Sequence, residues 1–119
     1  MKIELADAAI TDNQTPSAID ILKSMQGTKT ITVPLILNGQ KVHDGLVFNV
    51  GVLEYNNFLN ESQNQKISMT ASAANFLKRS VAKDDATVLA EAIKVPGLLD
   101  FFMGAIVPKV QPDIAESLD

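Results

Sequence analysis

The chain has 119 residues, of which 46% are hydrophobic and 20% charged, a size and balance typical of one globular domain. It contains no cysteine, which excludes disulfides, thiolate nucleophiles and cysteine-ligated zinc. Its formal net charge of −4 argues against general binding to nucleic acid.

Residues 1–29 read as a leader with one short helix. The first 14 residues lack the apolar run of a secretory signal and fit either a short strand or a loose arm. Thr15 then predicts a helix N-cap, Pro16 suits the first helical position, and Gly27 is a natural stop. The face of this helix is lined by Ala18, Leu22 and Met25, with Ile19 and Ile21 beside it.

An antiparallel β-hairpin is predicted for residues 30–50. Residues 30–37 are rich in β-branched and aliphatic side chains, and Asn38-Gly39 accepts the positive φ angles of a type I′ turn. The return strand should end at Val50, with Asp44-Gly45 acting as a second turn or as a bulge that shifts the register. The residues expected to share one face of this strand are Val42, Leu46, Phe48 and Val50.

From Gly51 the apolar period changes from 2 to 3.6, which predicts about four short helices over residues 52–107. The caps are Ser68 or Thr70 for the second helix and Asp84 or Asp85 for the third. The residues expected to face the core from the first three helices are Val52, Tyr55, Phe58, Leu59, Ala73, Phe76, Leu77, Val81, Val88, Leu89, Ala92 and Ile93. The fold class is therefore α+β, an N-terminal antiparallel hairpin followed by a bundle of about four short helices.

The last helix, roughly Gly97–Val107, is apolar on nearly every side and is interrupted only by Asp100 and Gly104. It is too short to cross a bilayer, which takes about 20 residues. Such a helix must be buried in its own core or against another molecule, and a domain of this size rarely surrounds one of its helices completely. Gly104 costs about 1 kcal/mol relative to Ala within a helix, which suggests close approach by a neighbouring element or by a partner.

No arrangement of residues for catalysis, metal binding or cofactor binding stands out. His43, the only histidine, lies beside Asp44, but adjacent strand residues point to opposite faces, and we interpret His43 as a turn residue. Helix capping accounts for the acidic pair Asp84-Asp85. The basic window from Lys66 to Lys83 favours charge complementarity at a helix end over a docking patch for an acidic partner.

Four asparagines in or beside predicted helices fit either an internal clamp between helices or recognition of a partner, and we favour the clamp because Asn75 directly precedes core-like Phe76. These asparagines are Asn56, Asn57, Asn60 and Asn75.

A series of motifs in residues 30–113 resembles the small tail assembly chaperones of long-tailed bacteriophages and prophages. The series is Phe48-Asn49-Val50, Tyr55-Asn56-Asn57 with Asn60, Asn75-Phe76-Leu77 with Val81, Pro96-Gly97, Gly104 and Pro112. Residues 1–29 lie outside the matched part, and residues 63–68 match only loosely. We therefore divide the chain into a leader (1–29), one α+β domain (30–113) and an acidic tail (114–119).

The resemblance implies a non-enzymatic protein of the infected bacterial cytoplasm that is absent from the finished virion. Such proteins hold the tape measure protein while tail tube subunits polymerise around it, and the resemblance carries over no catalytic residue and no cofactor. Binding to the tail tube protein and self-association are further expectations. The expected partner-binding residues are Leu98, Phe101, Phe102 and Ile106, with Asn57 and Asn60 as a second candidate face.

Two other function classes remain open. One is a structural tail or head-completion subunit, which would persist in purified virions. The other is a small regulatory or toxin-neutralising module, which would use the basic window to bind nucleic acid or an acidic toxin with steep salt dependence.

Overall fold

A long antiparallel hairpin forms the base of the domain in the computed structural model, which describes residues 17–115. β2 (Lys29–Leu37) and β3 (Gln40–Val50) make up its two-stranded sheet. The strands turn at Asn38 and Gly39, whose φ angles of 52° and 77° are those of a type I′ turn. The predicted hairpin and the position of its turn are confirmed.

A bulge interrupts the pairing near the middle of β3. Val33 pairs with Leu46, whereas Leu35 pairs with His43, so β3 contains one residue more than β2 between these two pairs. This extra residue lies at Asp44-Gly45, and the bulge expected there is confirmed.

The residues of β3 between the turn and the bulge are more exposed than those after the bulge. Leu46, Phe48 and Val50 are buried, as predicted, but Val42 is 51% exposed. A second register shift, between the pairs Leu35–His43 and Ile36–Lys41, makes Val42 a further extra residue of β3. Val42 therefore lies on the same side as Leu35 and Leu37, as predicted, but at an exposed position. Pro34 lies opposite the bulge, where its missing N–H removes no hydrogen bond from the regular ladder.

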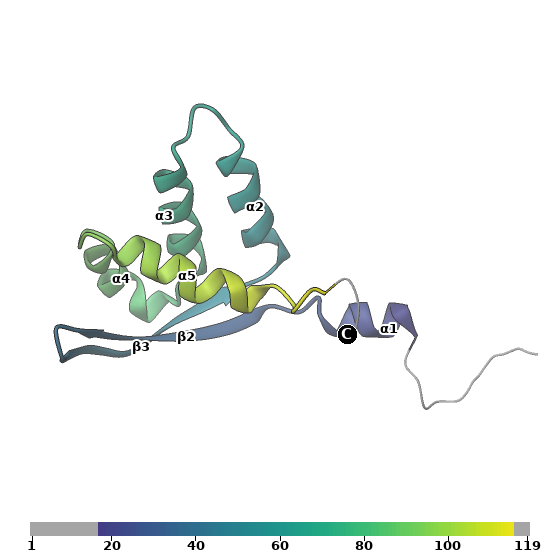
Figure 1. Ribbon diagram of the computed structural model, residues 1–119, viewed down its shortest axis with the longest axis horizontal. Coiled ribbons are helices and arrows are strands. Elements are labelled where there is room, and N and C mark those ends of the chain that lie inside the picture. Colours follow the sequence, from purple (N-terminus) through teal and green to yellow (C-terminus); the bar gives the residue numbers. More distant parts are fainter. Residues whose placement is uncertain (1–16, 116–119) are drawn as a thin grey trace, which may run out of the picture.

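Four α-helices and one 3₁₀ turn follow the hairpin and cover one of its faces (Figure 1). Their bounds are α2 (Val52–Ser62), α3 (Met69–Ser80), η1 (Lys83–Asp85), α4 (Ala86–Ala92) and α5 (Leu98–Val110). α2 packs on α3, while α5 contacts both β2 and α3. The predicted α+β class is confirmed.

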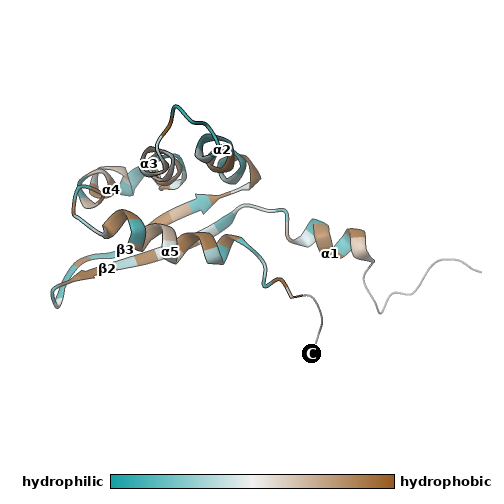
Figure 2. Cartoon of the chain, turned by 45° about the horizontal axis from the view of Figure 1, so that its top comes forward, coloured by the Kyte–Doolittle hydropathy of each residue, from teal (hydrophilic) through white to brown (hydrophobic). Residues whose placement is uncertain are grey.

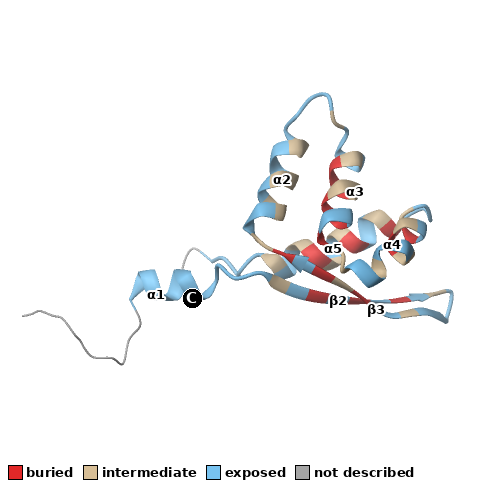
Figure 3. Cartoon of the chain, turned by 180° about the vertical axis from the view of Figure 1, so that it is seen from behind, coloured by how far each residue is buried: buried red, intermediate tan, exposed pale blue. Residues whose placement is uncertain are grey.

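The core lies between the hairpin and the helices, where Figure 3 shows the buried segments gathered. Phe76, Leu77 and Leu89 are fully buried, as predicted, whereas Val88 and Ile93 are only partly buried at its edge. The buried apolar residues are Ile31, Val33, Leu35, Leu46, Phe48, Val50, Ala73, Phe76, Leu77, Leu89, Ala92, Leu98, Phe102 and Ile106.

α2 is the least buried of these helices. Tyr55 and Phe58 pack against the core, and Phe58 stacks on Phe76 with ring centroids 5.3 Å apart. Val52 was expected on the same face but is 69% exposed, because it stands at the first turn of α2, at the edge of the hairpin. Leu59 is also exposed.

α5 extends three residues beyond its predicted end at Val107 and contains Pro108 within its last turn. Pro108 has no N–H to donate to the carbonyl of Gly104, four residues earlier. Gly104 is exposed, so water can reach that carbonyl. The close approach expected within the chain at Gly104 is wrong, because an added Cβ would meet no atom within 4 Å.

A separate helix, α1 (Ala18–Ser24), precedes the hairpin and projects from its end (Figure 1). Ser17 is its N-cap and accepts a hydrogen bond from Asp20 N–H at 3.1 Å. The cap predicted at Thr15 falls outside the described residues, as do Pro16 and residues 116–119 of the tail.

Candidate functional site

An apolar hollow, which we call the distal groove, lies between the turn end of the hairpin and α4. It has a volume of about 390 Å³. Val42 and Val95 at its rim are 51% and 44% exposed, and Glu91 is the only charged residue in its lining. The lining is Leu35, Leu37, Val42, Thr87, Val88, Glu91, Ala92, Val95 and Leu98. This geometry can receive an apolar side chain or one face of a helix.

α5 places one predicted binding residue at the surface and buries three. Phe101 is 47% exposed, whereas Leu98, Phe102 and Ile106 lie in the core at 8%, 0% and 0%. The expectation that Phe102 and Ile106 bind a partner is wrong, because these residues and Leu98 recur every four residues along the face of α5 that packs on the hairpin. Leu98 also lines the distal groove, and Phe101 is the part of the predicted face that is exposed. Phe102 stacks on Phe48 at 5.8 Å between ring centroids.

Phe101 extends the apolar surface beyond the distal groove. It lies three residues after Leu98, and residues at this spacing are neighbours on a helix surface. Its ring stacks on buried Phe102 at 5.6 Å, which holds the ring in place. The distal groove and Phe101 therefore offer an apolar surface that runs from the hairpin onto α5.

The asparagine clamp joins α2 to α3. Asn75 Nδ2 donates to Glu61 Oε1 at 3.1 Å, and Arg79 pairs with the other carboxylate oxygen of Glu61. These two hydrogen bonds lower the pKa of Glu61 below its ordinary value, and the bond from Arg79 has the larger effect. The internal clamp is confirmed for Asn75. Asn57 is half-buried and Asn60 exposed, and neither lines the distal groove.

A second polar junction joins the hairpin to the start of α4. Asp85 accepts the Val47 N–H at 2.9 Å through Oδ2, and its Oδ1 lies 3.3 Å from His43 Nε2. The N–H of Gly45 donates to His43 Nδ1 at 2.9 Å, so the ring hydrogen belongs on Nε2, facing Asp85. His43 therefore lies in β3 at the bulge and not in a turn, and its acidic neighbour is Asp85 instead of Asp44.

The junction also corrects the role predicted for the acidic pair. Asp85 is the residue before α4, but its side chain makes no capping hydrogen bond because both oxygens face the hairpin. Asp84 is exposed. For α3, by contrast, the cap at Ser68 is confirmed by a 3.0 Å hydrogen bond from Ala71 N–H.

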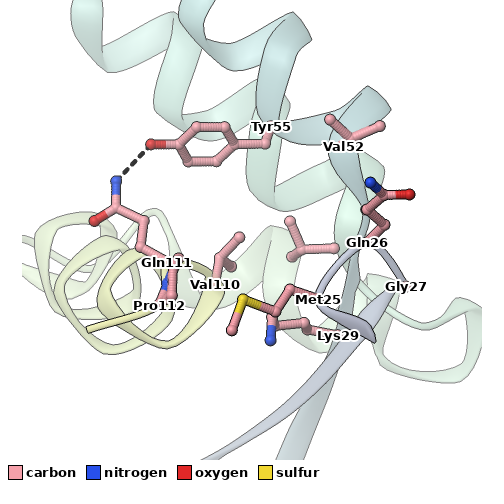
Figure 4. Close-up of a pocket in the computed structure, with 11 residues that line it drawn as sticks. Met25, Gln26, Gly27, Lys29, Val52, Tyr55, Val110, Gln111 and Pro112 are labelled. Carbon is pink, nitrogen blue, oxygen red and sulfur yellow. Dashed lines mark hydrogen bonds between the residues drawn. The ribbon is translucent and has the colours of Figure 1, made fainter. Parts of the chain in front are cut away.

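A larger hollow, the basal groove, lies at the opposite end of the domain, where α1 joins β2 (Figure 4). It has a volume of about 560 Å³. Tyr55 and Gln111 close one side through a 2.6 Å hydrogen bond between Gln111 Nε2 and the tyrosine oxygen. The lining is Met25, Gln26, Gly27, Lys29, Val50, Gly51, Val52, Tyr55, Val110, Gln111 and Pro112.

Within residues 17–115, no three His, Cys, Asp or Glu side chains come together in a way that could hold a metal ion. None of the helices in that range has the length and apolarity to cross a membrane. In the basic window, Lys78 and Arg79 occupy the last turn of α3, as charge complementarity at a helix end requires, and Arg79 pairs with Glu61.

No family model, no curated protein and no solved structure matches the chain. Neither groove was predicted from the sequence, because each combines residues from the hairpin with residues of distant helices. The available signals were the apolar face of the leader helix and the valines Val42 and Val95 beside turns.

Proposed function

We propose that this protein is a non-enzymatic tail assembly chaperone of a long-tailed bacteriophage or prophage. It binds the tape measure protein in the host cytoplasm while the tail tube assembles. The observation that supports this proposal is the apolar surface formed by the distal groove and Phe101, which leaves aliphatic and aromatic side chains open to water.

The chemistry of this surface suits an amphipathic helical client. A tape measure protein is long and helical, and its apolar stripes aggregate if they are left in water. A helix that lays such a stripe over Val42, Val95 and Phe101 removes apolar area from water on both molecules. The groove is lined mainly by aliphatic side chains, so it can bind many client helices that share an apolar stripe but differ in sequence.

Release requires that each contact be modest. The surface is shallow, and a long client must be held by several copies, so the combined affinity depends on the number of copies bound. The acidic net charge of −4 helps to keep the decorated client in solution.

Co-expression with the tape measure protein of the same phage tests the proposal. Phe101→Glu and Val95→Asp place a charge on the binding surface at exposed positions, so the fold should survive and the soluble, co-purified tape measure protein should fall at least tenfold. Ile36→Glu is the matched control, since Ile36 is 61% exposed and does not line the groove.

Circular dichroism of each variant separates loss of binding from loss of folding. Folded Phe101→Glu and Val95→Asp variants that retain the client would refute the distal surface as the binding site. Mass spectrometry of purified virions tests the chaperone class itself, because a structural tail or head-completion subunit would be found there in stoichiometric amounts.

A further inference from the structure

The leader helix α1 has an apolar stripe that no segment within residues 17–115 covers. Ala18, Ile21, Leu22 and Met25 follow the i, i+3, i+4, i+7 spacing of one helix face. The three large members are 43%, 56% and 48% exposed, and no residue of α1 is buried. Figure 3 shows the whole helix exposed, and Figure 2 shows apolar and polar residues sharing its circumference.

A helix this short needs a surface to pack on. Isolated helices of fewer than about 12–15 residues are marginal in water even when their sequence favours them. α1 has seven residues, yet it carries a working N-cap at Ser17 and polar residues such as Asp20 and Lys23 opposite the stripe. The sequence thus specifies an amphipathic helix that docks by one face.

The basal groove is an apolar surface of suitable character next to α1. Its walls come from the start of α2 and the end of α5, with Val52 and Val110 among the lining residues. Met25, at the end of α1, also lines the groove, whereas the rest of the helix leads away from it (Figures 1 and 4). Neither the groove nor the stripe is covered by any of the residues that the structure describes, and the two adjoin.

The connection to β2 favours a helix from another copy as the occupant. Only residues 26–28 separate the α1 C-cap from the start of β2, a span of about 10 Å when fully extended. α1 is itself about 10 Å long, so folding it back over the groove would require a full reversal within that link. Short links of this kind favour the exchange of an element between copies.

We propose that the basal groove receives α1 from a second copy of this chain, and that two copies exchange their leader helices reciprocally. A two-fold arrangement lets each stripe cover the groove of the other copy while each helix keeps its present direction relative to β2. The basal and distal grooves share no lining residue, so the exchange leaves the proposed client surface free.

Cysteine cross-linking tests the exchange in the full-length protein, which has no cysteine of its own. Leu22→Cys chains and Val52→Cys chains, tagged to differ in mass, are mixed and oxidised with copper phenanthroline. We expect a mixed disulfide dimer. Leu53→Cys is the matched control, because Leu53 is 65% exposed beside Val52 but does not line the groove, and it should cross-link at least tenfold less.

The doubly substituted chain, Leu22→Cys with Val52→Cys, identifies the alternative. If this double variant forms a disulfide within single chains, and the two single variants form no mixed dimer, α1 closes on the groove of its own chain and the proposal is overturned. Equal cross-linking of Val52→Cys and Leu53→Cys would overturn it as well, since the contact would then be random collision.

Sedimentation equilibrium gives an independent measurement. Leu22→Asp should weaken dimerisation at least tenfold, whereas Ser24→Asp, on the polar face of α1, should not. Mixing Leu22→Asp with Val52→Asp should give tighter association than either variant shows alone, because one intact helix then meets one intact groove. A monomeric wild-type chain at about 100 µM, well above the micromolar range of ordinary specific association, would refute the exchange.

Discussion

Asp85→Ala should destabilise the protein far more than the same change at its neighbour Asp84. Asp85 is 13% exposed in its side chain and accepts the Val47 N–H at 2.9 Å. Removing the carboxylate leaves that half-buried N–H without its partner, which costs about 1–3 kcal/mol. Losing the contact with His43 adds a smaller amount, so the total should reach about 2–3 kcal/mol.

Thermal and urea unfolding measure this difference directly. About 2 kcal/mol lowers the Tm of a domain of this size by at least about 8 °C. Asp84 is exposed, and Asp84→Ala should stay within about 0.5 kcal/mol of the wild type. Amide hydrogen exchange at Val47 should accelerate about thirtyfold in Asp85→Ala, which is the same 2 kcal/mol expressed as a rate.

Asp85→Asn tests the direction of the hydrogen bonds. The amide oxygen can still accept from Val47, but the NH₂ group then faces the Nε2–H of His43. His43 cannot exchange its ring hydrogen to Nδ1, because Nδ1 already accepts from Gly45. The Asn variant should therefore fall between the wild type and Asp85→Ala. Equal stabilities for Asp84→Ala and Asp85→Ala would show that the Asp85 carboxylate does not hold β3, and would refute the stabilising role of the polar junction.

Three further predictions concern the helices. Phe76→Ala removes a fully buried ring stacked on Phe58 and should cost about 3–5 kcal/mol in urea unfolding; a loss below about 1 kcal/mol would contradict its place in the core. Gly104→Ala should stabilise the protein by about 1 kcal/mol, since the new methyl group meets no atom, and a loss would reveal a contact at that face. Because the pKa of Glu61 is lowered, its pairing with Arg79 stabilises the fold fully above about pH 5, and this contribution is lost as the pH falls through the lowered pKa. Glu61→Gln should therefore remove that part of the pH dependence of the Tm between pH 7 and pH 3. An unchanged dependence of the Tm on pH would argue against the clamp.

The sequence by itself determined the features that depend on local chemistry. Asn38-Gly39 specified the turn because both residues accept positive φ, and the change of apolar period at Gly51 marked the start of the helices. Phe76 and Leu77 were predictable as core residues because polar neighbours mark the opposite face of α3. In each case a few adjacent residues carry the whole signal.

The tertiary structure decided which face of α5 is buried. A helix that is apolar on nearly every side has no periodicity with which to choose a face, so the pattern could not separate exposed Phe101 from buried Phe102. The choice follows from packing, since the ring of Phe102 stacks on Phe48 of β3. The sequence correctly indicated excess apolar surface on this helix but assigned too many residues to it.

The bulge and the polar junction were also decided by long-range contacts. Two register shifts, one on each side of the Leu35–His43 pair, return Val42 to the side of the helices and place it at the rim of the distal groove. The neighbouring residues alone predicted Asp85 as a helix cap, yet its carboxylate accepts a hydrogen bond from the N–H of Val47, 38 residues earlier in the chain. A carboxylate can satisfy either site, and only the folded arrangement of β3 against α4 determines which hydrogen bonds it makes.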